Sequence, residues 1–324
     1  MPCVKPKSKY SFCINSPHYK VLLKYVDDNK STLGNDIKCD LLTPSMTFSG
    51  ELSAKDICKE FTLLYKSFRI YSASGTSPDE IFSFGDCDFL NYWLNDKLRK
   101  SVIDGDKIDV RGFYKEIRKK NQSKIFDNED LENYMYNIDP YILNNMELLY
   151  DLYYYQRKIL DMLLNEVSPE DKNTCSYYMK NCYEKYDTAI NRCYGTYDEF
   201  YKALREFKST YDIVIEKGTN DIYKCKASTH FLLPKNDLVL EREKTKIMLI
   251  QGFTSFLMLT LTFPLIYKFT PFGPFLQGKI KMVMNMWKSP KKNKDKLLSS
   301  SMDIENNISD NGKYKLAYNS VTNE

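Results

Sequence analysis

An unbroken run of uncharged residues near the C-terminal end constrains this chain more than any other feature. It covers 21 residues between Lys246 and Lys268, and its first and last members are Ile247 and Tyr267. At about 1.5 Å per residue, a helix of this length crosses a hydrocarbon core of roughly 30 Å. The alternative is a buried helix of a water-soluble domain, but such helices rarely continue this far without a charge. We therefore expect one transmembrane helix over residues 247–267.

The charges and cysteines around this run predict its orientation. Residues 268–324 contain ten lysines and five acidic residues, whereas acidic residues dilute the basic ones just before the run. Lysine-rich flanks stay in the cytoplasm. All nine cysteines precede the run, as expected for a domain that meets an oxidising environment. We expect the N-terminal domain outside the cytoplasm and the C-terminal tail, residues 268–324, inside it.

The N-terminus does not resemble a conventional signal peptide. The segment MPCVKPKSKYSFCINS has no apolar run of the usual length and no small-residue cleavage site. The internal span would then act as the insertion signal, and the whole N-terminal domain would be translocated ahead of it.

Composition argues against nucleic-acid binding and against most enzyme classes. Lysine outnumbers arginine 39 to 8, although arginine is the residue that reads bases with paired hydrogen bonds. Only two histidines are present, which leaves few candidates for acid–base chemistry near neutral pH. The sequence has no glycine-rich phosphate loop, no His-Glu-x-x-His motif and no Cys-x-x-Cys pair. We expect no nucleic-acid partner, no cofactor or metal ion, and no enzymatic activity.

Apolar residues recur at helical spacing through most of the N-terminal part. The clearest series runs from Cys175 through Tyr197 to Tyr211, with intervals of three and four residues that average to the 3.6-residue helical period. This segment is either one long helix or a helix interrupted near Gly195. A second series, at residues 146–163, lies between two prolines, which is usual helix punctuation. The expected fold class is all-α, with a helical, cysteine-bearing N-terminal domain at residues 1–243, the transmembrane helix, and a short basic tail.

Three cysteines share one face of the segment at 175–211. Cys175, Cys182 and Cys193 are 7 and 11 residues apart, so in a continuous helix they are separated by about 10 and 16 Å along the axis. A disulfide needs a Cα separation below about 7 Å, so these three cannot bond to one another. Each should bond to a different element; the alternative is a buried reduced thiol. The candidate disulfide cysteines are Cys39, Cys58, Cys87, Cys175, Cys182, Cys193 and Cys225. Because nine is an odd number, at least one cysteine stays free or pairs between chains, and Cys3 is the expected one.

A second amphipathic segment follows the span. Leu276, Ile280, Val283 and Trp287 fall on one helical face, and lysines surround that face. Such a helix suits a membrane surface, with its tryptophan at headgroup depth and its lysines beside anionic lipid. We expect membrane lipid as a partner, an interfacial basic segment at residues 276–296, and a disordered end after it.

Aromatic residues are numerous, with 26 tyrosines and 18 phenylalanines. Most occupy core positions of the helical series, so packing is the better explanation for them. Three consecutive rings, those of Tyr153, Tyr154 and Tyr155, must point some of their side chains outward. They are the predicted contact patch for a partner protein.

Three stretches together resemble one protein family. They are residues 87–98 (CDFLNYWLNDKL), residues 175–182 (CSYYMKNC) with residues 200–208 (FYKALREFK), and residues 267–273 (YKFTPFG). In this order, and spread over nearly the whole chain, they resemble the PIR (Plasmodium interspersed repeat) variant proteins of malaria parasites, particularly the vir-type branch. The resemblance implies a cysteine-bearing helical domain, one span near the C-terminus and a short basic tail, often without a classical signal peptide.

The resemblance also implies a location and a function. Such a protein would be a variant surface or exported membrane protein of a malaria parasite, either on the infected red-cell surface or in an exported parasite membrane. Its N-terminal domain would bind an unknown host or parasite protein and would support antigenic variation and immune evasion. The alternative is an internal scaffold or trafficking component of parasite-derived membranes. The resemblance implies no catalytic residues.

Overall fold

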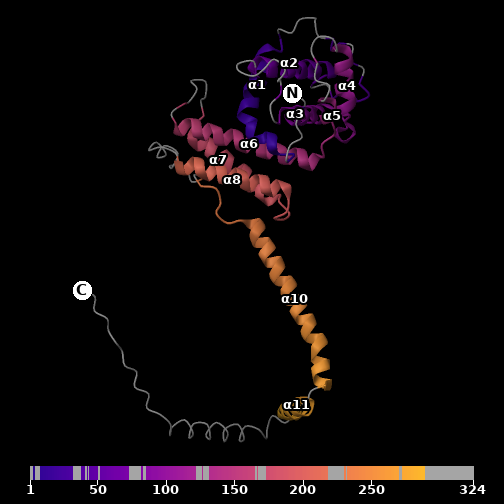
Figure 1. Ribbon diagram of the computed structural model, residues 1–324, viewed down its shortest axis with the longest axis vertical. Coiled ribbons are helices and arrows are strands. Elements are labelled where there is room, and N and C mark those ends of the chain that lie inside the picture. Colours follow the sequence, from indigo (N-terminus) through magenta and orange to yellow (C-terminus); the bar gives the residue numbers. More distant parts are fainter. Residues whose placement is uncertain are drawn as a thin grey trace, which may run out of the picture. The chain divides into compact units, whose positions relative to one another are not determined.

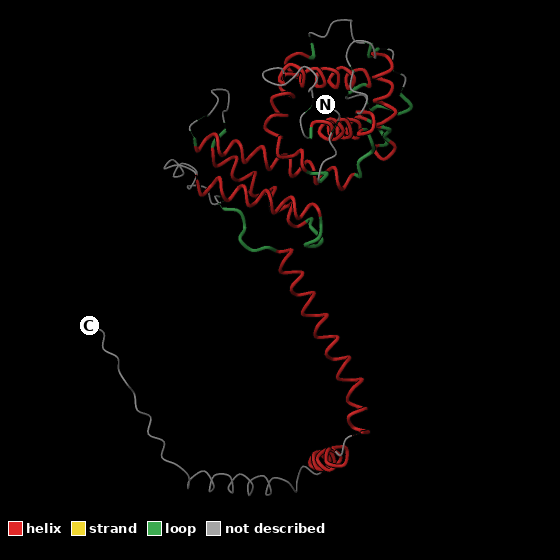
Figure 2. The backbone as a smooth tube through the Cα atoms, viewed as in Figure 1, coloured by secondary structure: helices red, strands yellow, loops and turns green. Residues whose placement is uncertain are grey.

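The structure is a computed structural model, and it describes residues 3, 8–31, 38–40, 42, 44–49, 52–72, 82, 85–121, 126, 131–164, 166, 173–217, 230, 232–269 and 272–288. Across these residues every regular element is a helix, and the one β pairing is an isolated bridge between Phe48 and Val102. The prediction of a mostly helical protein is therefore confirmed (Figure 2).

The helices follow one another along the chain and are joined by loops. In the N-terminal half they are η1 (Ser11–Asn15), α1 (Ser16–Asn29), α2 (Ala54–Ser72), α3 (Asp86–Ser101), η2 (Gly105–Lys107), α4 (Val110–Asn121) and α5 (Leu131–Tyr134). After these come α6 (Pro140–Leu163), α7 (Cys175–Asn191), α8 (Glu199–Lys217), α10 (Leu238–Phe269) and α11 (Phe272–Lys288). The chain divides into two compact units, Met1–Thr245 and Lys246–Glu324.

The α6 helix connects the two groups of helices in the N-terminal unit. Asp139 caps its start, because the carboxylate accepts hydrogen bonds from the backbone N–H groups of Tyr141 and Ile142, and Pro140 occupies the first turn. α6 packs against η1, α1 and α3, and also against α7 and α8. Figure 1 shows α6, α7 and α8 lying side by side.

Aromatic rings fill the core between α1, α3 and α6. The rings of Tyr19 and Phe89 stack with 3.9 Å between their centroids, and Tyr150 stacks with Phe89 at 6.0 Å. The buried hydroxyl of Tyr19 donates a hydrogen bond of 2.9 Å to Asp86, in the first turn of α3. Full burial of a ring of this size contributes about 1.5–3 kcal/mol, so this cluster is a main source of stability for the unit.

The segment at 175–211 consists of two helices. Thr174 caps α7, which ends at Asn191, and α8 begins at Glu199 after a loop that contains Gly195. The interrupted alternative is therefore the correct one. The interruption changes the environment of Tyr197. The helical period predicts this residue on the buried face, but it belongs to the loop and is 89% exposed.

Candidate functional site

The α10 helix has the properties of a membrane anchor. Its residues Leu238–Ile266 form a helix long enough and apolar enough to cross a membrane, with a mean hydropathy of 1.7 over the most apolar part. None of that part is buried, and side chains such as Phe253 and Leu261 are largely exposed. In water this continuous apolar surface would be unfavourable at roughly 25 cal/mol per Å². A hydrocarbon environment removes the cost.

The threonine hydroxyl groups in this part of α10 donate hydrogen bonds to the helix itself. Thr254 donates to the carbonyl of Gln251 (3.0 Å), and Thr262 donates to the carbonyl of Met258 (2.7 Å). Because of these bonds, the hydroxyl groups do not face lipid without a hydrogen-bond partner. The interpretation of residues 247–267 as a span is thus chemically consistent, although the side chain of Tyr267 lies outside the described residues.

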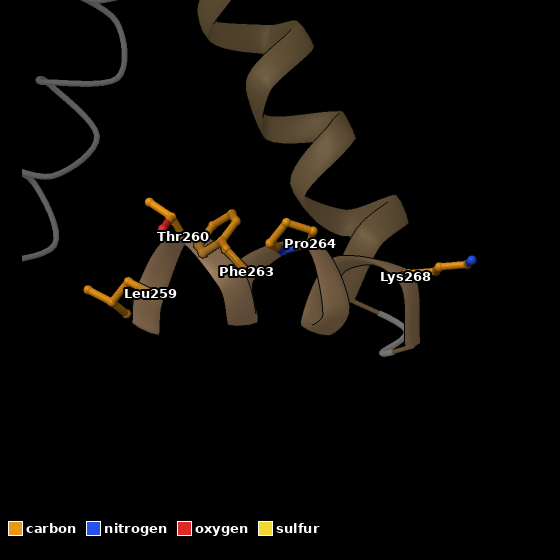
Figure 3. Close-up of a pocket in the computed structure, with 5 residues that line it drawn as sticks. All are labelled: Leu259, Thr260, Phe263, Pro264 and Lys268. Carbon is orange, nitrogen blue, oxygen red and sulfur yellow. The ribbon is translucent and has the colours of Figure 1, made fainter. Parts of the chain in front are cut away.

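A shallow hollow of about 730 Å³ lies on this helix around Pro264. Figure 3 shows Leu259, Thr260, Phe263 and Pro264 beside the hollow, whereas the ammonium group of Lys268 points away from the other four side chains. The Thr260 hydroxyl is already bonded to the carbonyl of Leu257 at 2.8 Å. The hollow therefore offers apolar shape, suited to lipid chains, rather than groups that could perform chemistry.

The α11 helix follows and combines apolar and basic residues. Ile280 and Val283 are about half exposed, and Lys279 and Lys281 are exposed as well. The side chains of Leu276 and Trp287 lie outside the described residues, as do residues 289–324, which include the expected disordered end. The expected interfacial role of residues 276–296 stays a prediction.

Two disulfide bonds lie wholly within the described residues, and both belong to the N-terminal unit. Cys3 bonds to Cys87 and Cys39 bonds to Cys58, with Cα separations of 6.0 and 5.8 Å. The expectation that Cys3 stays free or pairs between chains was wrong, because Cys3 lies against the first turn of α3, which carries Cys87. Cys175 is also disulfide-bonded, and Cys225 lies outside the described residues.

Among the cysteines that the structure describes, three are free thiols, and two of these were expected to be bonded. Cys182 and Cys193 are fully buried, as is Cys13 in η1. The Sγ atoms of Cys193 and Cys13 donate to the backbone carbonyls of Ala189 and Met146. Burial raises the pKa of the Cys182 thiol well above its ordinary value and raises the pKa of Cys193 to about 12. The expectation of a disulfide failed because these two thiols meet packed side chains and backbone rather than partner cysteines.

The tyrosines at 153–155 do not form an exposed patch. Tyr153 is buried, and its ring meets that of Phe207 edge-on at 5.1 Å. Tyr154 and Tyr155 are half-buried, and the ammonium group of Lys20 lies 5.2 Å from the Tyr154 ring. The prediction of a contact patch here was wrong because α6 is central, so more than one of its faces is covered by neighbouring helices.

A polar hollow of about 250 Å³ lies between α1, α2, α3 and α6. Ion pairs line it: Lys97 bonds to Glu60 at 2.8 Å, and Lys100 bonds to Asp96 at 2.6 Å. These ion pairs lie beside aromatic residues of the core, Phe89 and Tyr150, which also line the hollow. Among the residues that the structure describes, no group of three or more His, Cys, Asp or Glu side chains could hold a metal ion.

The most exposed aromatic side chains of the described N-terminal unit lie in the α7–α8 loop. Tyr194 is 80% exposed, and it flanks Gly195 on one side as Tyr197 does on the other. The loop is held in place at its start, since the Tyr141 hydroxyl donates to the carbonyl of Arg192 at 2.6 Å. The sequence did not predict this exposed pair, because the apolar residues keep their helical spacing across the loop. The turn-forming Gly195 was a signal against burial here.

The α7–α8 loop also contacts the first turns of α10. The Arg242 guanidinium donates to the carbonyl of Cys193 at 3.4 Å. Nearby, the hydroxyl of Tyr201 in α8 donates at 2.7 Å to Asp237, which directly precedes α10. Gly195 lies so close to Glu243 that an added Cβ would be 3.2 Å from the carboxylate. The loop therefore sits beside the part of α10 that directly precedes the apolar run.

Comparison with known proteins gives no relative from which a function could be transferred. No family model, no curated protein and no solved structure matches this chain.

Proposed function

We propose that this chain is a single-pass membrane protein whose helical N-terminal unit is a display and binding module of the PIR type. The observation that carries the proposal is the most apolar part of α10, none of which is buried and which a membrane of ordinary thickness would cover. Membrane lipid is then the partner of α10, and a host or parasite protein is the partner of the N-terminal unit.

The disulfides support placing the N-terminal unit outside the cytoplasm. Disulfides persist in oxidising environments and are rare where thiols are kept reduced. The bonds of Cys3 with Cys87 and of Cys39 with Cys58 precede the apolar run in the chain, and the lysine-rich tail follows it. Both observations favour the same orientation, with the tail in the cytoplasm.

The resemblance of three sequence stretches to the PIR family supports the biological setting. On this proposal the protein is a variant antigen of a malaria parasite that is exported to the infected red cell. There its N-terminal unit faces the host, binds a host molecule and contributes to immune evasion.

Antibody labelling of infected cells tests the proposal. Antibodies to residues 1–243 should label intact cells, whereas antibodies to residues 297–324 should label only permeabilised cells. Labelling of intact cells by the tail antibody alone would reverse the orientation. Labelling by neither antibody before permeabilisation would favour the alternative, an internal scaffold of parasite-derived membranes.

A further inference from the structure

The pair of exposed tyrosines in the α7–α8 loop needs an explanation. Tyr194 and Tyr197 are 80% and 89% exposed, more than any large apolar residue of the described part of the α10 span. Single exposed rings are common on protein surfaces, but here two such rings lie within one short loop. The position of this loop along α10 indicates what covers it.

Contacts within the N-terminal unit place the loop beside the first turns of α10, a few residues before the apolar run. Arg242 and Glu243, which lie beside Cys193 and Gly195, precede the first residue of the apolar run by only five and four residues. At about 1.5 Å per residue, this separation is roughly 6–8 Å along the helix. The headgroup layer on each side of a hydrocarbon core is about 5–8 Å thick. The backbone of Arg242 and Glu243 is thus separated from the apolar run by about the thickness of one headgroup layer.

The loop is anchored rather than loosely attached. The ring of Tyr194 stacks on that of Tyr141 with 5.8 Å between centroids, and the Arg192 guanidinium lies 4.6 Å from the same Tyr141 ring. The Arg192 side chain also donates to Asn145 at 2.7 Å. These contacts hold Arg192 and Tyr194 against the first turns of α6.

We infer that Tyr194 and Tyr197 contact the headgroup layer of the bilayer and seat the N-terminal unit on the membrane surface. Tyrosine suits this layer because its ring is apolar and its hydroxyl can bond to lipid headgroups or water. The proposed partner of this loop is the bilayer itself, because the loop contacts the first turns of α10 and the apolar run follows them directly. The inference rests on the proposed function, because it requires α10 to cross the membrane.

Fluorescence quenching in liposomes tests the contact. The full-length variant Tyr197→Cys is labelled with an environment-sensitive thiol dye and reconstituted with lipids that carry a spin label on the headgroup. The free thiols of Cys13, Cys182 and Cys193 are buried, so the unsubstituted chain serves as the background measurement. The matched control is Tyr177→Cys, because Tyr177 is also an exposed tyrosine but lies near the opposite end of α7, about 21 Å from its last residue.

We expect the dye at position 197 to show blue-shifted emission and loss of intensity with the spin-labelled lipid, and the dye at position 177 to show neither. Equal behaviour of the two dyes in a protein that resists carbonate extraction would overturn the seating of the loop and leave the membrane anchor intact. Extraction of the protein by carbonate would overturn both proposals together. A Tyr194→Cys variant repeats the measurement at a second position, in case the label at 197 disturbs the loop.

Discussion

Individual residues at helix starts and in the core determine how the N-terminal unit packs. Gly85 directly precedes α3 and has a φ of 91°, a conformation that side-chain-bearing residues rarely adopt. A Cβ at this position would also lie 3.1 Å from the Cα of Phe12. Gly85 thus lets η1 approach the start of α3, which carries Cys87 and Phe89 into the core.

Substitution of this glycine should destabilise the N-terminal unit. Gly85→Ala is expected to lower the free energy of unfolding by about 1–2 kcal/mol, the usual cost of a left-handed conformation for a residue with a Cβ. Denaturant unfolding of the full-length protein in detergent, followed by near-ultraviolet circular dichroism, measures the loss. Gly278→Ala is the control, because nothing lies within 4 Å of the added Cβ. An unchanged midpoint for Gly85→Ala would contradict the argument.

The free thiols should be unreactive in the folded protein. Burial raises the pKa of Cys193 to about 12, so at pH 8 only about one thiol in 10⁴ is ionised, and the thiolate is the reactive form. Iodoacetamide at pH 8, without reductant, should modify Cys13, Cys182 and Cys193 only after denaturation. Mass-spectrometric peptide mapping of native and denatured samples measures this. Rapid modification of Cys193 in the native sample would show that its surroundings open to solvent.

Whole helices differ in the surface that covers them. α6 is covered on several sides by η1, α1, α7 and α8, whereas α10 exposes apolar side chains all around its C-terminal part. A helix that is apolar on every side suits either a protein core or a lipid bilayer, and the most apolar part of α10 is not buried in the described structure. α11 presents lysines beside apolar residues, as a helix at the bilayer surface does.

A charge in the middle of α10 should impair membrane insertion. Leu257→Arg is expected to cost about 2.5–3.5 kcal/mol of insertion free energy, because an ionised side chain is placed in hydrocarbon. Carbonate extraction of membranes from expressing cells measures the fraction that remains embedded. Leu240→Arg is the matched control, since Leu240 belongs to the same helix but precedes the apolar run. If Leu257→Arg stays embedded as well as the unsubstituted chain, the anchor lies elsewhere.

At the scale of the whole molecule, covalent bonds and burial stabilise the N-terminal unit together. The Cys3–Cys87 bond joins residues 84 positions apart, and the Cys39–Cys58 bond joins residues 19 positions apart. Closing such loops stabilises the folded unit by restricting the unfolded chain. Strain in the folded state and residual structure in the unfolded state alter the size of this stabilisation.

Reduction should therefore lower stability. Removal of native disulfides is expected to cost about 2–5 kcal/mol, which shows as a clear fall in melting temperature. Thermal unfolding of the full-length protein with and without reductant measures the change. The Cys39→Ser/Cys58→Ser double variant should respond less to reductant, because one bond is already absent. A melting temperature that does not respond to reductant would show that burial alone holds the unit together.

Local patterns in the sequence were sufficient for the apolar helix at 247–267 and for the mostly helical fold, because both depend on charge and period over neighbouring residues. They were insufficient for the cysteines and the tyrosines. Whether Cys3 bonds to Cys87, or whether Cys182 finds a partner, depends on which distant segments meet in the folded unit. The burial of Tyr153 and the exposure of Tyr197 likewise depend on how α6, α7 and α8 pack around one short loop. The sequence by itself determined which segments are helical and which one suits a membrane, because backbone hydrogen bonding and hydrophobicity act locally. Only the tertiary structure decided which cysteines pair and which tyrosines are exposed, because both arise from contacts between residues far apart in the chain.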